Sequence, residues 1–111
     1  MSEHLGIFEQ AVLLSLAHPR TDFGREGYGR AILKEVQHRL ERDVSAGAVY
    51  ATLDRLAKKG YVTSRLGEPT PERGGRAKRF FSVTGAGAVA LQESERAVGA
   101  LRNLVAQPGV D

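Results

Sequence analysis

Two groups of cationic side chains lie in one stretch of this sequence, from Ser45 to Thr84. The first group is Arg55 and Lys58, and the second surrounds a glycine pair: Arg73, Arg76, Lys78 and Arg79, around Gly74-Gly75. The stretch holds eight of the 16 Lys and Arg residues but three of the 13 Asp and Glu residues, although the net charge of the chain is only +3. Guanidinium and ammonium groups bind phosphate oxygens through charge-assisted hydrogen bonds. The local excess therefore indicates a polyanionic partner.

The first pair lies on a segment with the pattern of a short helix, from residue 45 to residue 59. Ser45 is a favourable N-cap, and Gly60 provides a C-terminal stop. Apolar residues recur at helical spacing along one face: Val49, Leu53, Leu56 and Ala57. This face is expected to pack on the body of the protein.

The opposite face of this helix begins with small residues, and a bulky side chain there would keep the helix away from a surface. Such a helix is suited to enter the major groove of DNA. Alanine methyls can meet a thymine methyl, Ser45 or Tyr50 can hold a phosphate, and Arg55 or Lys58 can reach guanine or the flanking backbone. The residues predicted to contact DNA are Ser45, Gly47, Ala48, Tyr50, Ala51, Arg55 and Lys58. For Tyr50, a place in the core remains the alternative.

The second group of cations lies between two β-rich runs, residues 61–66 and 79–83, which flank a turn-rich segment, 67–76. Helix, strand, basic loop and strand form the plan of a winged helix. In this plan the loop follows the DNA backbone or the neighbouring minor groove. Arg73, Arg76 and Lys78 are therefore predicted to contact phosphates.

Three further helices are expected around this unit. Residues 28–42 form a supporting helix with Ile32, Val36 and Leu40 in its core stripe, and residues 19–27 form the loop before it. The fold class is mainly α (α+β): one winged helix-turn-helix domain over residues 1–111, with the DNA-binding unit at about 28–84 and flanking helices at about 2–18 and 85–106. Thr84 is the expected cap of the last helix.

The two flanking helices carry more apolar surface than a small domain can cover. The first is apolar over much of its circumference, and the last is about 30 Å long with a coiled-coil-like stripe. We therefore expect a homodimer joined through both helices. Its predicted contact residues are Leu5, Phe8, Val12, Leu91, Val98, Leu101 and Val105.

Composition favours one globular domain without a catalytic site. The chain has 111 residues, of which 41% are apolar and 26% charged, and it contains no cysteine. No apolar run approaches the ~20 residues that span a bilayer, so we expect a cytoplasmic protein without membrane contact. The histidines share no metal-binding spacing. Gly85–Ala90 matches a dinucleotide-binding pattern but lacks the βαβ context. No cofactor, metal or enzymatic activity is expected.

Several motifs together resemble the PadR-type winged-helix transcriptional regulators. They are Tyr28-Gly29 with Ile32, Gly47–Leu53, Lys59–Val62, and Arg73–Thr84 with Gly87. The resemblance covers nearly the whole chain and is closest to short members with a single C-terminal helix. It implies a cytoplasmic dimeric repressor that binds double-stranded DNA, with its subunits joined through the first and last helices. For a two-fold dimer we expect an inverted-repeat operator.

Two questions remain open in the sequence. Some relatives bind flat aromatic effectors, often against an aromatic residue, whereas the last helix here contains none; whether an effector exists is unknown. The alternative function is a winged-helix module that binds another protein, with weak or no DNA binding. The basic, glycine-containing loop favours DNA binding over this alternative.

Overall fold

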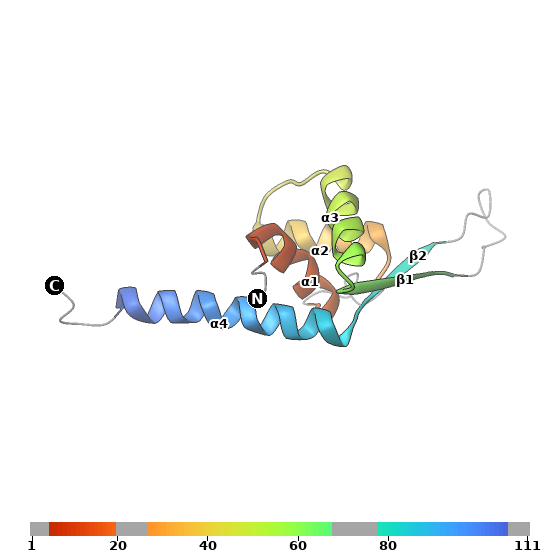
Figure 1. The fold of residues 1–111 in the computed structure, drawn as a ribbon. Helices are drawn as coiled ribbons and strands as arrows, with labels where there is room; N and C mark the ends of the chain where they lie inside the picture. Colours follow the sequence, from red (N-terminus) through yellow and green to blue (C-terminus); the bar gives the residue numbers. More distant parts are fainter. Residues whose placement is uncertain (1–4, 20–26, 68–77, 107–111) are drawn as a thin grey trace.

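The computed structural model describes residues 5–19, 27–67 and 78–106. It confirms a mainly helical fold with one two-stranded antiparallel sheet (Figure 1). The elements in order are α1 (Ile7–Ala17), α2 (Gly29–Leu40), α3 (Ala46–Lys58), β1 (Val62–Leu66), β2 (Arg79–Val83) and α4 (Gly85–Ala106). Each predicted helix is present, but α1 begins at Ile7 rather than near Ser2, because Gly6 is its N-cap. The supporting helix α2 covers 29–40, within the predicted 28–42.

The core lies where α1, α2 and α3 meet. Each helix contributes one apolar stripe, and the central side chains are completely buried: Val12, Leu13, Ile32, Val36, Val49, Leu53 and Leu56. The predicted stripe of α3 is correct except at Ala57, which is exposed. Thr52 is buried instead, since it lies between the turns that carry Val49, Leu53 and Leu56.

Arg39 of α2 forms an ion pair with a buried carboxylate and also binds the end of α1. Glu35 has a fully buried side chain, and Arg39 Nε lies 3.3 Å from its Oε2. Arg39 Nη2 also donates hydrogen bonds to the carbonyl oxygens of Leu14 (3.2 Å) and His18. Leu14 O also accepts from His18 N–H at 2.8 Å, so Arg39 adds a second partner at the C-terminal end of α1. Glu35 is therefore a charged residue in the interior of the protein, next to the apolar stripe of α2.

Strands β1 and β2 form the hairpin of the winged helix, with Val62 opposite Val83 and Leu66 opposite Arg79. Phe81 turns into the core, whereas Phe80 lies on the other face and is partly exposed. The segment before α2 runs along the outer edge of β2, because Phe81 N–H donates to Gly27 O at 2.8 Å and Tyr28 forms a bridge with Phe80. The start of α2 is thereby fixed to the hairpin.

Helix α4 begins at a close contact with the hairpin. Thr84 Oγ1 accepts from Gly87 N–H at 3.0 Å and donates to Gly60 O at 2.6 Å, which confirms Thr84 as a cap. A Cβ at Gly87 would collide with the Tyr61 carbonyl, so only glycine permits this approach. The C-terminal part of α4 extends past the other described elements (Figure 1).

The stripe of α4 that was predicted to join two subunits divides into two parts. Its first part is buried within this chain, where Leu91 packs in the core and Ser94 Oγ accepts from Leu5 N–H at 3.1 Å. Leu5 and Val12 are likewise buried by their own chain. These three apolar side chains are therefore core residues and present almost no surface to a partner. The second part is exposed, with Val98 at 42% and Leu101 at 63%.

None of the helices in the described ranges is long and apolar enough to cross a membrane.

Candidate nucleic-acid interface

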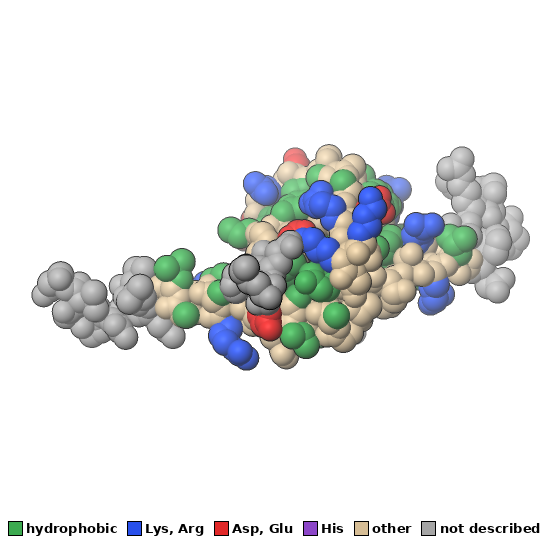
Figure 2. All heavy atoms as spheres, in the orientation of Figure 1, with side chains coloured by type: hydrophobic (Ala, Val, Ile, Leu, Met, Phe, Trp, Pro, Cys, Tyr) green, Lys and Arg blue, Asp and Glu red, His purple; other side chains and the backbone are tan. Residues whose placement is uncertain are grey.

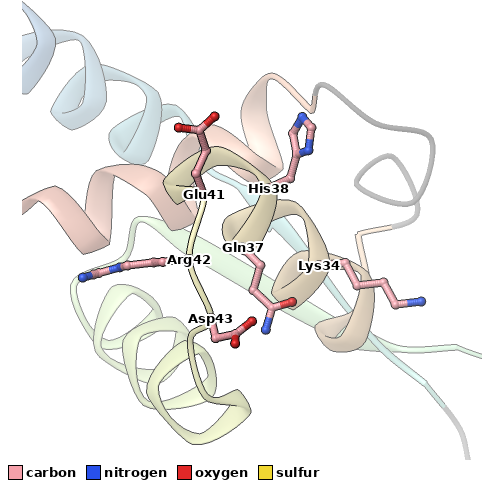
Figure 3. Close-up of a pocket in the computed structure, with 6 residues that line it drawn as sticks. All are labelled: Lys34, Gln37, His38, Glu41, Arg42 and Asp43. Carbon is pink, nitrogen blue, oxygen red and sulfur yellow. The ribbon is translucent and has the colours of Figure 1, made fainter.

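The turn before α3 is built to hold the start of that helix in place. Glu41 ends α2 in the left-handed conformation (φ 53°), and Gln37 Nε2 then donates across the turn to Val44 O at 3.0 Å. Ser45 Oγ accepts from Ala48 N–H at 3.0 Å, which confirms the predicted cap. Figure 3 shows the polar hollow over this turn, where Gln37 and Asp43 lie close together and Lys34 and Arg42 point away from each other.

The two faces of α3 differ as the sequence predicted. One face is buried in the core, and the other is exposed along the whole helix. Six of the seven residues predicted to contact DNA are small or cationic and exposed: Ser45, Gly47, Ala48, Ala51, Arg55 and Lys58. With no bulky side chain in the first turn, the backbone of α3 can approach a surface closely.

Tyr50, the seventh residue, is not a core residue, because 45% of it is exposed. Its ring lies directly against Gly29, the first residue of α2, where any Cβ would collide with the phenol. Gly29 is therefore required for this contact between α3 and α2. The Tyr50 hydroxyl lies at the start of α2, beside the exposed face of α3.

Arg55 has partners that local sequence patterns do not reveal. Its Nη2 donates to Thr52 Oγ1 at 3.0 Å, and its Nε lies 3.8 Å from Glu9 Oε2. The same carboxylate oxygen lies 3.2 Å from Lys59 Nζ. Glu9 is on α1, far away in sequence, so only the fold brings this carboxylate next to Arg55.

The hairpin adds cations beside α3. Lys78 and Arg79 are exposed at the start of β2, whereas Arg73 and Arg76 lie outside the described residues. Arg65 on β1, which the sequence analysis did not select, is exposed as well, and its guanidinium carbon lies 4.7 Å from the centre of the Phe80 ring. Figure 2 shows Lys and Arg side chains over α3 and along the hairpin. The exposed faces of these elements thus form a cationic surface.

Two further hollows lie on the described surface, one beside α3 and one between α1 and α2. One, of about 450 Å³, runs beside α3 and is lined by Phe8, Val44, Ala48, Ala51 and Arg55, among others. The other, of about 250 Å³, is an apolar groove between α1 and α2, lined by Ile7, Gln10, Ala11, Leu14, Arg39 and Leu40. In the part of the chain that the structure describes, no group of three or more acidic or histidine side chains is arranged to hold a metal ion.

Solved structures with the same fold are regulators of transcription. A PadR-like transcription factor from Bacteroides fragilis is 21% identical, with a TM-score of 0.72 over 90% of this chain and 87% of that one. A PadR-like transcriptional regulator from Bacillus cereus is also 21% identical, with a TM-score of 0.69 and coverages of 90% and 88%. A transcriptional regulator from Thermoplasma acidophilum is 19% identical, with a TM-score of 0.69 and coverages of 90% and 87%.

The family assignment rests on sequence. A search of curated proteins gives no match. The model of the transcriptional regulator PadR-like family, however, matches residues 22–93, which include α2, α3, the hairpin and the start of α4. Its members regulate transcription by binding DNA and are not enzymes. The chain belongs to the PadR-like family of transcriptional regulators.

Proposed function

We propose that this protein is a homodimeric repressor that binds an inverted-repeat operator by inserting one α3 helix from each subunit into the major groove. The observation that carries this proposal is the exposed face of α3, small at its beginning and cationic toward its end. In the proposed complex the hairpin follows the phosphate backbone. Repression results where the operator overlaps a promoter, because the bound dimer excludes the polymerase.

The second subunit is proposed from the exposed half of α4. Val98 and Leu101 continue the stripe that Leu91 and Ser94 begin, but they remain exposed among the residues that the structure describes. Val105 follows Leu101 by four residues, which continues the spacing of the stripe in the sequence, and we include it in the proposed interface. Ile7, 77% exposed at the rim of the α1–α2 groove, and the half-buried Phe8 give a second apolar area on α1.

The insertion of α3 into the major groove is tested by Ala51→Glu, which places a carboxylate in the middle of the exposed face of this helix. Against phosphates and acceptor-rich base edges, this charge is unfavourable, so we expect the affinity for duplex DNA to fall by at least tenfold in fluorescence anisotropy. Nuclease protection of the region upstream of the gene should disappear with it.

Ala88→Glu is the matched control, since it makes the same change at an exposed position of α4. It should bind DNA like the parent, and both variants should keep the parent's thermal unfolding. If Ala51→Glu binds as tightly as Ala88→Glu, α3 does not enter the groove. If the parent shows no salt-dependent binding to any duplex, the protein is not a DNA-binding protein.

A further inference from the structure

Four side chains toward the loop end of the described hairpin form a continuous stack, with a cation at each end and two aromatic rings between them. Lys78 Nζ lies 4.4 Å from the centre of the Tyr28 ring. The Tyr28 and Phe80 rings meet edge to face, with centroids 6.1 Å apart and planes at 71°. The Arg65 guanidinium lies 4.7 Å from the Phe80 centroid. We call these four residues the aromatic stack.

Backbone contacts hold the two rings in place. Tyr28 is bridged to Phe80 along the edge of β2, and Phe80 lies directly opposite Arg65 in the register of the hairpin. A Cβ at Gly67 would lie 2.5 Å from Phe80 Cε2, so this glycine leaves the room that the Phe80 ring occupies. Gly67 N–H also donates to Lys78 O at 2.7 Å, closing the described end of the hairpin. The rings are therefore anchored, whereas the two cations remain exposed.

The aromatic stack is also connected to α3. Tyr28 is the N-cap of α2, and the ring of Tyr50 from α3 packs against the next residue, Gly29. A line of contacts thus runs from Tyr50 through Gly29 and Tyr28 to Phe80. It connects the exposed face of α3 with the cations of the hairpin.

We propose that Tyr28 and Phe80 are positioning residues, which hold Lys78 and Arg65 in place as two phosphate-binding cations. This inference rests on the proposed DNA binding and adds Arg65 as a contact. Long cationic side chains lose rotamer freedom when they bind, which weakens binding. A cation already held over an aromatic face has lost part of that freedom beforehand, and its remaining N–H groups are still available to a phosphate.

The first measurement is the salt dependence of binding to a mixed-sequence 30-base-pair duplex, for the full-length protein. Lys78→Gln and Arg65→Gln should each lower the log–log slope by about 0.9, the value for one lost phosphate contact. Arg96→Gln, on an exposed part of α4, is the matched control and should keep the parent's slope. An unchanged slope in Lys78→Gln and Arg65→Gln would show that the stack cations do not touch DNA.

The second measurement separates positioning from simple fold support. Tyr28→Leu should weaken binding by about two- to fivefold, which corresponds to the ~0.5–1 kcal/mol of an exposed cation–π pair, without changing the salt slope. Tyr28→Phe keeps the ring and should bind like the parent. In the Lys78→Gln background, Tyr28→Leu should have little further effect.

If Tyr28→Leu lowers the DNA affinity equally in the parent and in the Lys78→Gln variant, the positioning role is refuted. A ring that only supports the fold would act in this way, regardless of Lys78. If Tyr28→Leu does not fold, the slopes of Lys78→Gln and Arg65→Gln still decide whether these cations contact phosphate. A parent protein without salt-dependent binding would instead refute the proposed function itself.

Discussion

At the scale of single residues, Glu9 is an acid from α1 that lies beside two cations of the α3 region, Arg55 and Lys59. Its carboxylate lies 3.2 Å from Lys59 Nζ and 3.8 Å from Arg55 Nε, and its other oxygen accepts from Gly6 N–H at 3.3 Å. Arg55 is 55% exposed at its side chain, so the pair contributes at most about 1 kcal/mol to stability. Its larger effect falls on binding, because a negative charge next to Arg55 opposes an approaching phosphate.

We predict that Glu9→Gln tightens non-specific DNA binding several-fold and steepens the salt dependence, by up to about 0.9 in slope if one more cation then engages a phosphate. Glutamine keeps the size of the side chain and the acceptor for Gly6. Glu95→Gln, exposed on α4, changes the net charge equally and is the control for anisotropy titrations on a mixed-sequence duplex. Equal gains in both variants would mean that only net charge matters.

At the scale of elements, the junction of α4 with the hairpin depends on Gly87. Its Cα faces the backbone of Tyr61, where a Cβ would lie 3.0 Å from the carbonyl carbon and closer still to the oxygen. Since both partners are backbone, no side chain can rotate away. We expect α4 to move outward if the residue is enlarged, with loss of the packing of Leu91 against the core.

Gly87→Ala should therefore lower the free energy of unfolding by about 1–3 kcal/mol, the usual cost of overpacking. Gly85→Ala, in the same turn, meets no other group within 4 Å and should change it by less than about 0.5 kcal/mol. Urea unfolding followed by circular dichroism gives both values. A Gly87→Ala protein as stable as Gly85→Ala would show that α4 does not pack as closely as described.

Local patterns predicted the elements well because their signals lie within a few residues. Ser45 and Thr84 are caps, Gly60 has a φ of 81° after α3, and the alternation of β2 turns Phe81 inward. The predicted exposed face of α3 is also present. Periodicity alone, however, could not separate burial by the same chain from burial by a partner.

The missed contacts join residues far apart in sequence. The contacts of Glu9 with Arg55, of Arg39 with the carbonyls of Leu14 and His18, and of Tyr28 with Lys78 all depend on how the helices and the hairpin meet. Local sequence patterns also could not show which chain buries an apolar residue. The apolar character of Leu5, Val12 and Leu91 predicted that they are buried, but not that their own chain buries them.

At the scale of the whole molecule, the exposed end of α4 predicts self-association. Val98→Asp with Leu101→Asp would place two carboxylates in the apolar contact, so we expect a monomer in sedimentation velocity, with DNA affinity reduced to the non-specific level. Gln92→Asp with Ala100→Asp adds the same charge on another side of α4 and should leave the dimer intact. A dimer that survives the first pair of changes would place the interface elsewhere.

A dimer is also what the chemistry of α3 requires for specificity. Its exposed face has few groups that hydrogen-bond to bases, and Arg55 is partly engaged by Glu9 and Thr52. One subunit therefore discriminates weakly between sequences. Two subunits multiply their discrimination only if both helices reach the same face of the duplex, about one helical turn of ~10 base pairs, or a multiple of it, apart.

The most direct test of the account is the affinity for an operator found by nuclease protection, before and after insertion of five base pairs between its half-sites. Half a turn places the half-sites on opposite faces of the duplex, so affinity should fall to near the non-specific level. Insertion of ten base pairs returns the half-sites to the same face of the duplex and should recover part of the affinity. Equal binding to the original and the five-base-pair operator would contradict the account, because one subunit would then read the site alone.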